Sequence, residues 1–467
     1  TAGLEIMTRE NRGTGDWTQE NYLGPAGIEN DPTWPRIVTS GDENQYIHMM
    51  YNSYVEYEGQ ATALLYSRSE DGGETWDPQD EILEGLGSDY YTEIGADSYV
   101  FAARGDVVAI LIADAWYDLI LMKSEDNGDN WEKTVIWEHP YPFFDWEVTI
   151  TDTFFCVDNS GSVAIGPDGK CHVVFGMNRV LHAEVGTTYS LFPYVDGIGY
   201  WNEDMPTFSS DRDALAGPQY GYENSEMIED YNYIGWTQDV DGDGEITLVD
   251  DVMYYREIGF STMPSITVDD DNQVFVVWAS TTETYDNFDF NFKKIWSRAW
   301  IPGGGWGEFY HVTESIIHIF DESIYPTMAL NSDDDIHFIY QADGTPGLAL
   351  DDEHDYQENR IIHVTLSKDD LYTGIGEEAI ISDESVSQNF PNPFSGTTTI
   401  TVYMNESANL SLEIMNLVGQ KVYEADRGVA NDGTHFFQVD ARSFEAGIYF
   451  YTVRAGNNAV TKKMIVQ

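Results

Sequence analysis

An acidic stretch near the middle of the chain is the clearest candidate for chemistry. In DVDGDGEITLVDD, residues 239–251, aspartates stand at the first, third, fifth and twelfth positions and a glycine at the sixth. Carboxylates at these positions, with the backbone carbonyl at the seventh, form the oxygen shell that Ca²⁺ prefers, and the glycine permits the sharp turn between ligands. We therefore predict a calcium site. Its expected ligands are Asp239, Asp241, Asp243, Glu245, Thr247 and Asp250.

This spacing resembles an EF-hand loop, and aspartate rather than glutamate at the twelfth position is similar to a dockerin half-repeat. After the loop, Val249, Val252 and Met253 have helical spacing. The resemblance implies either a structural calcium clamp or a module that docks a cohesin partner. Because dockerins usually carry two such loops and we find one here, the clamp is favoured.

Two further stretches share a polar turn pattern. SRSEDGGETWD, residues 67–77, and SEDNGDNW, residues 124–131, have the spacing Ser-x-Asp-x-Gly, with Trp at the eighth position. Ser and Asp side chains can bond the turn backbone, glycine supplies unusual dihedrals, and tryptophan can fill the gap between sheets. The residues involved are Ser69, Asp71, Gly73, Thr75 and Trp76 in the first copy, and Ser124, Asp126, Gly128 and Trp131 in the second. A degenerate third copy is SRAWIPGGGW, residues 297–306.

The pattern resembles the Asp-box, or BNR repeat, of sialidase-like β-propellers. In that family the boxes lie on turns remote from the active site, so the resemblance implies a fold rather than an activity. A sialidase would also need three arginines around a carboxylate, a Tyr–Glu nucleophile pair and an Asp acid/base. The nearest candidates are Arg36, Arg104 and Arg179, and the family's Phe/Tyr-Arg-Ile-Pro motif is missing. We predict that these arginines pair with acidic residues inside the fold, and we assign no catalytic residue.

Five short apolar segments indicate a repeated element that would position these motifs. They are HMMY (48–51), LIAD (111–114), HVVF (172–175), FVVW (275–278) and HFIY (337–340). Tyr51 and Phe175 are 124 residues apart, and Trp278 and Tyr340 are 62 apart, which gives a period of 62. The gap from Phe175 to Trp278 is 103 residues, so an insertion of 41 interrupts the repeat and contains the calcium loop.

Each segment is one strand of a hairpin, and a second strand pair follows, as in ATALLYSRSEDGGETWDPQDEIL. Four strands per repeat predict an all-β fold, a five- or six-bladed β-propeller over residues 1–384, with the insertion at about 203–260. The family resemblance implies six blades. The N-terminal residues 4–23 are similar to an outer strand pair without its inner pair, and we expect them to close the ring.

The C-terminal part differs in composition. Residues 389–467 carry six basic and seven acidic side chains. We predict a linker at 385–396 and a small β-sandwich at 397–467, from six or seven alternating strands. NFPNPF, LEIMNLVGQKV, FEAGIYFYTV and the final KKMIVQ resemble the type A sorting domain of the type IX secretion system. This resemblance implies export to the outer cell surface or beyond. Whether the domain is retained after export stays open.

The charge balance excludes several partners. The chain has 22 basic and 82 acidic residues, a net charge of −60, and would repel nucleic acids and anionic lipids. No apolar run approaches the roughly 20 residues of a membrane span. The chain begins at Thr1 without a signal peptide, so we expect a processed form. Cys156 and Cys171 are either bridged or two buried thiols.

These observations favour a secreted or cell-surface, calcium-stabilised β-propeller that acts in extracellular binding or assembly. The expected partners are an extracellular protein or polysaccharide, a second copy in a filament or surface layer, and the type IX secretion machinery. The alternative is a sialidase-like glycoside hydrolase or another polysaccharide-degrading enzyme. The missing arginine motif favours a non-catalytic role, and the sequence leaves the question of an enzyme open.

Overall fold

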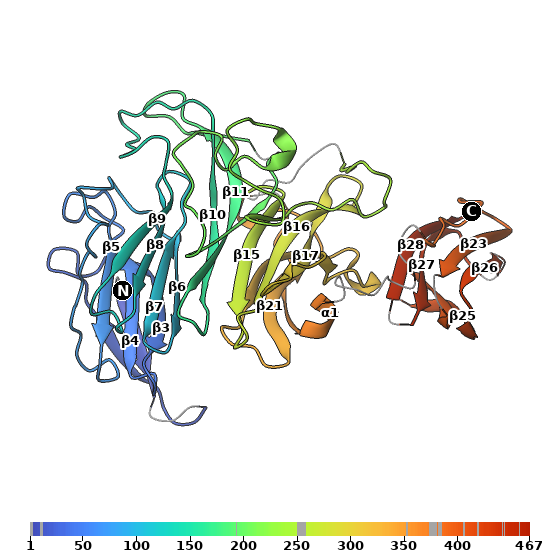
Figure 1. Ribbon diagram of the computed structural model, residues 1–467, viewed down its shortest axis with the longest axis horizontal. Coiled ribbons are helices and arrows are strands. Elements are labelled where there is room, and N and C mark those ends of the chain that lie inside the picture. The colour runs from blue at the N-terminus through green and yellow to red at the C-terminus, as the bar shows by residue number, and fades with distance from the viewer. Residues whose placement is uncertain are drawn as a thin grey trace.

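The computed structural model contains strands and very little helix, which confirms the all-β prediction (Figure 1). It describes residues 3–467 except 10–12, 193, 250–257, 352–353, 373–380, 382–384, 405–406, 418–419, 441, 443 and 457. In this described part, the one α-helix is α1 (Lys368–Tyr372), and 3-10 turns occur at Pro218–Tyr220, Ile316–His318 and Ala349–Asp351. None of these helices has the length and apolar character of a membrane span.

A hairpin and five antiparallel sheets follow one another in chain order across Figure 1. The hairpin is β1 (Leu4–Thr8) and β2 (Thr18–Tyr22). The first sheet is β3 (Thr33–Ser40), β4 (Tyr46–Asn52) and β5 (Leu64–Ser69). The second is β6 (Tyr99–Arg104), β7 (Val107–Ile112), β8 (Leu119–Ser124) and β9 (Glu132–Trp137). The third is β10 (Phe154–Ile165), β11 (Cys171–Leu181), β13 (Ile198–Asn202) and β14 (Tyr233–Gly235), with β12 (Ser190–Leu191) beside β11.

The fourth sheet is β15 (Ser261–Val268), β16 (Val274–Asp286) and β17 (Asn291–Ile301), with β18 (Gly305–Trp306) and β19 (Tyr310–His311) along β17. The fifth is β20 (Glu322–Met328), β21 (Asp335–Asp343) and β22 (Arg360–Ser367). The five recurring apolar segments of the sequence all fall on or at the end of the second strand of a sheet: β4, β7, β11, β16 and β21. The 62-residue period is therefore the period of the sheets.

The first strands of four sheets share a bulge with a left-handed residue. The register shifts at Trp34 in β3, Asn159 in β10, Met263 in β15 and Tyr325 in β20, where φ is 49°, 61°, 54° and 55°. Neighbouring bulges touch, because Met263 N–H donates to Ser160 Oγ at 3.1 Å and Tyr325 N–H donates to Met263 Sδ at 3.4 Å. Extra residues of this kind bend and twist a strand. Four of the five sheets therefore carry the same bulge in their first strand.

Successive sheets pack face to face through their apolar side chains. One core spans the first three sheets, a second joins the third to the fourth, and a third joins the fourth to the fifth. The hairpin covers the outer strands of the first sheet through Leu4 and Tyr22 against Met49, Tyr51 and Leu65. Among the described residues, the first and fifth sheets make no extended contact with each other. The structure therefore contains a series of sheets, and neither ring closure nor a blade number is established.

A buried lysine connects three of these sheets. Lys293, in β17, is 4 % exposed, and its ammonium group donates to the carbonyls of Gly259 at 2.9 Å and Phe260 at 2.7 Å. Its backbone N–H donates to the Glu322 carboxylate of the fifth sheet at 2.6 Å. Burial lowers the pKa of Lys293 to about 8, although the charges of Glu322, Asp196 and Asp158 favour the cation. The positive charge of Lys293 therefore compensates the negative charges of carboxylates on both neighbouring sheets.

The turns at 69–76 and 124–131 have the same internal bonds. Ser69 Oγ accepts the Gly73 N–H at 2.7 Å, and Ser124 Oγ accepts the Gly128 N–H at 2.8 Å. The carboxylate of Asp71 accepts the N–H and the hydroxyl of Thr75, and this lowers the pKa of Asp71 to about 2. In the second turn, Asp126 bonds Asn130 in the same way.

The tryptophans of these turns pack edge to face on tyrosines of the preceding unit. The ring centroids of Trp131 and Tyr66, in the first sheet, are 5.2 Å apart. Those of Trp76 and Tyr22, in the hairpin, are 5.5 Å apart. The degenerate third copy does the same, since Trp306 lies 5.1 Å from Tyr200 in the third sheet. Tyr22 of the hairpin therefore contacts the turn tryptophan of the next sheet as Tyr66 and Tyr200 do in the first and third sheets. This arrangement makes the hairpin a partial sheet that precedes the first.

The C-terminal unit is a sandwich with its own core and stands apart from the five sheets in Figure 1. One sheet is β23 (Thr397–Met404) with β26 (Gly433–Asp440). The other is β25 (Lys421–Ala430), β24 (Ala408–Asn416), β27 (Gly447–Ala455) and β28 (Asn458–Val466). The segment predicted as a linker, 385–396, contributes Val386 and Phe394 to this core. In the third sheet, Cys156 and Cys171 are both buried.

Replacing the buried lysine tests its role in joining the sheets. We expect Lys293→Met to lower the free energy of unfolding by about 3–5 kcal/mol, because it leaves buried carboxylates without their counter-charge. Lys170→Met is the matched control, since Lys170 pairs with Asp204 at the surface, where solvent screens the pair, and its loss should change the free energy of unfolding little. Urea denaturation measures both. Equal stability of Lys293→Met and the wild type would contradict the role.

The turn aspartate gives a pH-dependent prediction. Because the folded pKa of Asp71 is depressed to about 2, its contribution to stability is present above its ordinary pKa and is lost as pH falls through 2. Asp71→Asn should therefore melt at a lower temperature than the wild type at pH 7, and the difference should narrow from about pH 4 downward. Glu74→Gln, in the same turn, is the control and should leave the melting temperature unchanged. A pH-independent difference would show that the charge of Asp71 is irrelevant.

Candidate functional site

The acidic loop brings three of its predicted ligands together. Oxygen atoms of Asp239, Asp241 and Asp243 lie within 4.8 Å of one another, and all three side chains are exposed. Asp239 accepts the N–H groups of Gly242 at 2.7 Å and Gly244 at 2.8 Å. These bonds hold the first carboxylate toward the centre of the loop. The glycines have φ values of 70° and 91°, which favour residues without a Cβ.

The other predicted ligands are placed less completely. The N–H of Glu245 donates to Asp243 at 2.9 Å, and the Glu245 side chain is exposed. Thr247 lies beside the fourth sheet, where its N–H donates to a carboxylate oxygen of Glu283 at 2.5 Å. Asp250 and the helix predicted after it fall on residues 250–257, outside the described residues.

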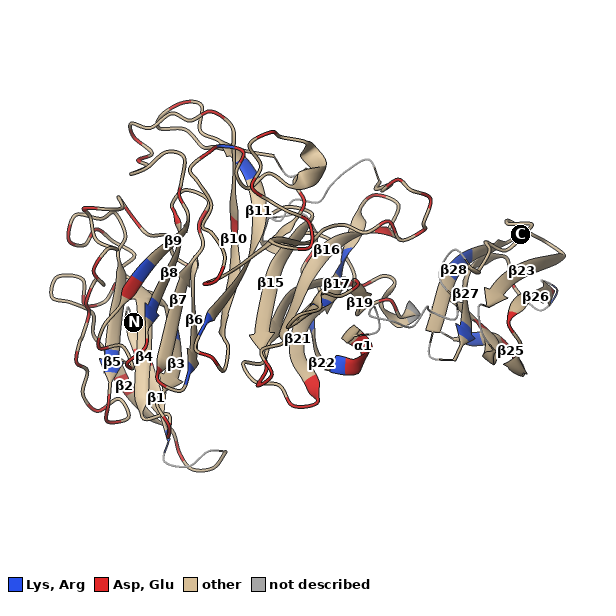
Figure 2. Cartoon of the chain, viewed as in Figure 1, with Lys and Arg blue, Asp and Glu red and all other residues tan. Residues whose placement is uncertain are grey.

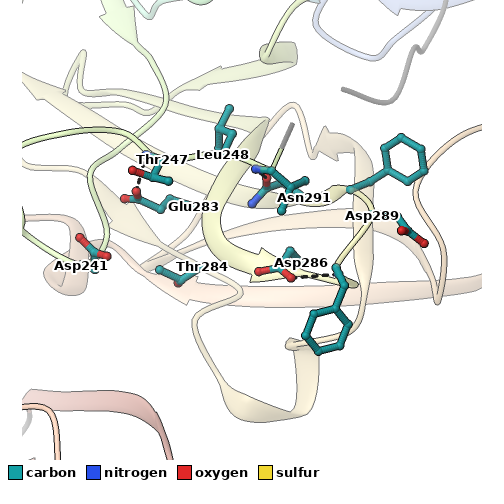
Figure 3. Close-up of a pocket in the computed structure, with 11 residues that line it drawn as sticks. Asp241, Thr247, Leu248, Glu283, Thr284, Asp286, Asp289 and Asn291 are labelled. Carbon is teal, nitrogen blue, oxygen red and sulfur yellow. Dashed lines mark hydrogen bonds between the residues drawn. The ribbon is translucent and has the colours of Figure 1, made fainter. Parts of the chain in front are cut away.

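Two side chains of the fourth sheet hold the loop against the sheet (Figure 3). The carboxylate of Glu283, at the end of β16, accepts the N–H of Val240 at 3.0 Å and that of Thr247. Asn291, at the start of β17, accepts the N–H of Val249 at 2.7 Å and donates to the Thr282 carbonyl at 3.0 Å. Both ends of the loop are thereby tied to one strand connection. Both residues thus position the loop through its backbone N–H groups.

Electrostatics couple Glu283 to the acidic cluster. Burial raises the pKa of Glu283, and the charges of Asp241 and Asp239 raise it further, while the bonds from Thr247 and Val240 lower it. A cation between the aspartates would remove part of this repulsion. We therefore expect cation binding to strengthen the hydrogen bonds that ionised Glu283 accepts, and these bonds to favour cation binding in turn.

The donor set fits a hard divalent cation. The carboxylates of Asp239, Asp241 and Asp243 converge, and hydrogen bonds to Asp239 bend the loop around them. All the side-chain atoms that converge are oxygens, the ligand type that Ca²⁺ prefers. Beside the cluster lies an open hollow of about 760 Å³. It is lined by Asp241, Thr247, Leu248, Val249, Glu283, Thr284, Asp286, Phe288, Asp289, Phe290 and Asn291.

The three arginines weighed for a sialidase site lie apart and are engaged separately. Arg36 pairs with Asp97. Arg104 pairs with Asp270 and donates to the carbonyls of Ile165 at 3.1 Å and Val268 at 3.0 Å, so it joins the ends of three first strands. Arg179 lies over the ring of Phe155, with 5.1 Å from its guanidinium carbon to the ring centroid, and near Phe192 and Tyr222. These contacts hold sheets and loops together.

Most acidic residues lie in the loops between strands (Figure 2). One group gathers where the fourth and fifth sheets end, around an open hollow of about 630 Å³. Its aspartates are Asp269, Asp270, Asp271, Asp333, Asp334, Asp335 and Asp369. Lys368 pairs there with Asp269 at 2.9 Å.

A family model described as "Secretion system C-terminal sorting domain" matches residues 388–467. The predicted export domain is thus confirmed, and the protein is one that a bacterium secretes or carries on its outer surface. The match covers the C-terminal unit and says nothing of the five sheets. No curated protein matches the chain.

Several solved structures are similar to the chain at low identity. A polysaccharide lyase of family PL25, an ulvan lyase, is 10 % identical, with 91 % of this chain and 84 % of that one covered and a TM-score of 0.42. PorZ, a surface component of the type IX secretion system of Porphyromonas gingivalis, is 12 % identical, with 97 % and 55 % covered and a TM-score of 0.27. A sialidase of Trypanosoma rangeli is 10 % identical, with 96 % and 84 % covered and a TM-score of 0.26. Scores this low carry no argument about function.

Calcium titration tests the loop. We expect Ca²⁺ to raise the melting temperature of the wild type and a chelator to reverse this, because the ion binds the folded loop. Asp241→Ala should abolish the shift. Glu283→Gln should weaken calcium affinity by about 10–100-fold, the usual effect of losing a group that orients ligands.

Asp289→Ala is the control, because Asp289 lines the neighbouring hollow without belonging to the cluster. Isothermal titration calorimetry gives the affinity, and differential scanning calorimetry gives the melting temperature. A wild type that melts at the same temperature with calcium and with chelator would overturn the site. If Glu283→Gln bound calcium as tightly as the wild type, Glu283 would have no positioning role.

Proposed function

We propose that this protein is an extracellular, calcium-stabilised β-propeller scaffold that binds or assembles outside a bacterial cell. The observation that carries the proposal is the sorting domain at residues 388–467, which sends the chain to the cell exterior. The remaining residues then work where calcium is available and partners are extracellular proteins, polysaccharides or further copies of the chain.

The propeller assignment is supported by repetition. Five sheets follow one another with the same strand order, and four of their first strands carry the same left-handed bulge. The hairpin adds a sixth unit, since Tyr22 meets Trp76 as Tyr66 meets Trp131. Radial repetition of small antiparallel sheets is the propeller architecture. We propose six units, as sialidase-like Asp-box propellers have.

Calcium would have a structural role. The loop is tied at both ends to the connection of β16 and β17, so an ion held by Asp239, Asp241 and Asp243 would stabilise that connection. This favours a clamp on the fourth sheet over a free dockerin-like module. The ion would supply charge neutralisation there and no reaction step.

The alternative is a sialidase-like glycoside hydrolase or another polysaccharide-degrading enzyme. A sialidase would need its arginines to converge on one carboxylate of the substrate. Arg104 instead bonds two backbone carbonyls and Asp270, and Arg179 is enclosed by aromatic rings. These contacts favour a binding role over a sialidase.

Activity assays separate the two functions. We expect no turnover of a fluorogenic sialoside or of a panel of neutral and acidic polysaccharides, together with measurable retention of the protein on a polysaccharide or on extracellular protein. Affinity electrophoresis measures retention. Turnover by the wild type that Arg36→Ala abolishes would overturn the binding role. Arg442→Ala, in the sorting domain, is the control for loss of a surface arginine.

A further inference from the structure

Arg179, in β11, forms no ion pair with a carboxylate in the described part of the chain, so the prediction that it pairs with an acidic residue is not confirmed. Its side chain is partly exposed, and its Nε is buried without a hydrogen-bond partner. The other described arginines from β3 to β22 all pair with carboxylates; they are Arg36, Arg68, Arg104, Arg212, Arg298 and Arg360. In a chain of net charge −60, Arg179 is therefore a cation that no described carboxylate neutralises.

Aromatic rings from three segments surround this guanidinium. Its carbon lies 5.1 Å from the ring centroid of Phe155, 5.5 Å from that of Phe192 and 5.8 Å from that of Tyr222. The backbone fixes two of these neighbours, because Arg179 pairs with Phe155 in the sheet and its carbonyl accepts the Phe192 N–H at 2.9 Å. Ring faces attract a guanidinium, but they carry no net charge and cannot replace the two oxygens of a carboxylate. The rings therefore hold the cation in place and leave its charge uncompensated.

Two tyrosines extend this site toward solvent. The Tyr220 hydroxyl accepts the Asp196 N–H at 2.8 Å and donates to the Tyr194 carbonyl at 3.3 Å. Burial raises the pKa of Tyr220 to about 12, and the positive charge of Arg179 acts in the opposite direction, so the hydroxyl lies within reach of that charge. The Asp196 carboxylate accepts the Thr237 N–H at 2.8 Å rather than pairing with Arg179. Tyr194, anchored through its backbone, keeps its side chain 57 % exposed near the cation.

An oxyanion is the group that this arrangement lacks. The terminal nitrogens of a guanidinium form a planar fork that matches two oxygens of a carboxylate or a sulfate. An aromatic ring offers its negative face to the C–H groups of a sugar ring. A sugar that carries a carboxylate or a sulfate can therefore use both parts of the site. Because a net charge of −60 repels a densely charged chain, a sparsely charged polysaccharide fits better than a polyanion.

We propose that Arg179 and Tyr194 bind a single anionic sugar residue of an extracellular polysaccharide, with its carboxylate or sulfate oxygens on the terminal nitrogens of the guanidinium. This names a ligand class for the binding role proposed above and rests on it. A sugar is preferred over an acidic peptide because the exposed ring of Tyr194 can pack on the sugar that carries the anion. Arg179 acts alone here, since Arg36 and Arg104 pair with Asp97 and Asp270.

Isothermal titration calorimetry of the full chain with calcium tests the site. A glucuronate-containing tetrasaccharide and a sulfated galactose tetrasaccharide supply the two anions, cellotetraose is the neutral sugar, and tetraglutamate is an anion without a sugar. We expect at least one anionic sugar to bind about 10-fold or more tightly than cellotetraose and tetraglutamate, because only the anionic sugars supply ring and anion together. The tighter of the two identifies the preferred anion as a carboxylate or a sulfate.

Arg179→Gln should weaken binding of that sugar by roughly 10–100-fold, the effect of losing charge-assisted hydrogen bonds. Tyr194→Ala should weaken it by roughly 3–10-fold through the lost ring contact. Arg212→Gln is the matched control, because the Arg212 carbonyl accepts the Phe155 N–H at 2.9 Å beside the site but its guanidinium already pairs with Asp152 at 2.8 Å. Both arginine variants change the net charge equally, so only Arg179→Gln should alter the affinity.

Circular dichroism checks that the variants fold. Equal affinity of Arg179→Gln and the wild type overturns the inference, and if Arg179→Gln does not fold, an unchanged affinity of Tyr194→Ala overturns it. So does a wild type that binds neither anionic sugar, or that binds cellotetraose or tetraglutamate as tightly. In those cases, retention of the protein on a neutral polysaccharide or on extracellular protein leaves the binding role standing. Absence of retention on any of these materials contradicts both.

Discussion

The neutralisation of a buried cation holds the second half of the molecule together. Lys293 lies in the fourth sheet, and carboxylates reach it electrostatically from the third sheet and the fifth. A buried lysine is tolerated only when its hydrogen bonds and charge are matched, so the positions of Gly259, Phe260 and Glu322 are constrained together. Glu283 and Asn291, beside the connection between β16 and β17, also bind the backbone of the acidic loop at 239–249. The acidic loop and the neighbouring sheets are thus both attached near the connection between β16 and β17.

Local patterns allowed much of this fold to be predicted. The second strands were visible because each combines β-branched and aromatic residues with an adjacent polar turn, as in FVVW after DDDN. Ser69 and Asp71 bond within their own turn, so their spacing alone indicates the geometry. The sorting domain was recognisable because its motifs are contiguous. Asp239, Asp241 and Asp243 of the acidic loop lie within five residues, so their proximity follows from the sequence alone.

Contacts between distant segments could not be predicted. Glu283 lies 43 residues after Val240, and nothing in its neighbourhood marks it as a clamp, although it stands in a buried strand where an isolated carboxylate is unusual. Trp34, Met263 and Tyr325, the residues at three of the bulges, are each followed by a proline. Because a proline within a strand also occurs in edge strands, it does not by itself indicate a bulge. Pairing of Arg104 with a residue 166 positions away depends on how three sheets meet. Ring closure depends on contacts of the same long range.

The repeated bulge also affects how this scaffold can change its surface. At Trp34, Asn159, Met263 and Tyr325 the backbone is left-handed, which penalises β-branched residues but accepts side chains as different as an indole, an amide, a thioether and a phenol. All four residues are partly or largely exposed on the first strands of their sheets. Asn159 Oδ1 accepts the Ala115 N–H at 2.7 Å and Met263 Sδ accepts the Tyr325 N–H at 3.4 Å, so these two side chains also join neighbouring sheets. Substitution of Trp34 or Tyr325 instead alters the side chain presented at the first strand and leaves these bonds in place. The side chains at Trp34 and Tyr325 can therefore vary while the frame of the fold stays constant.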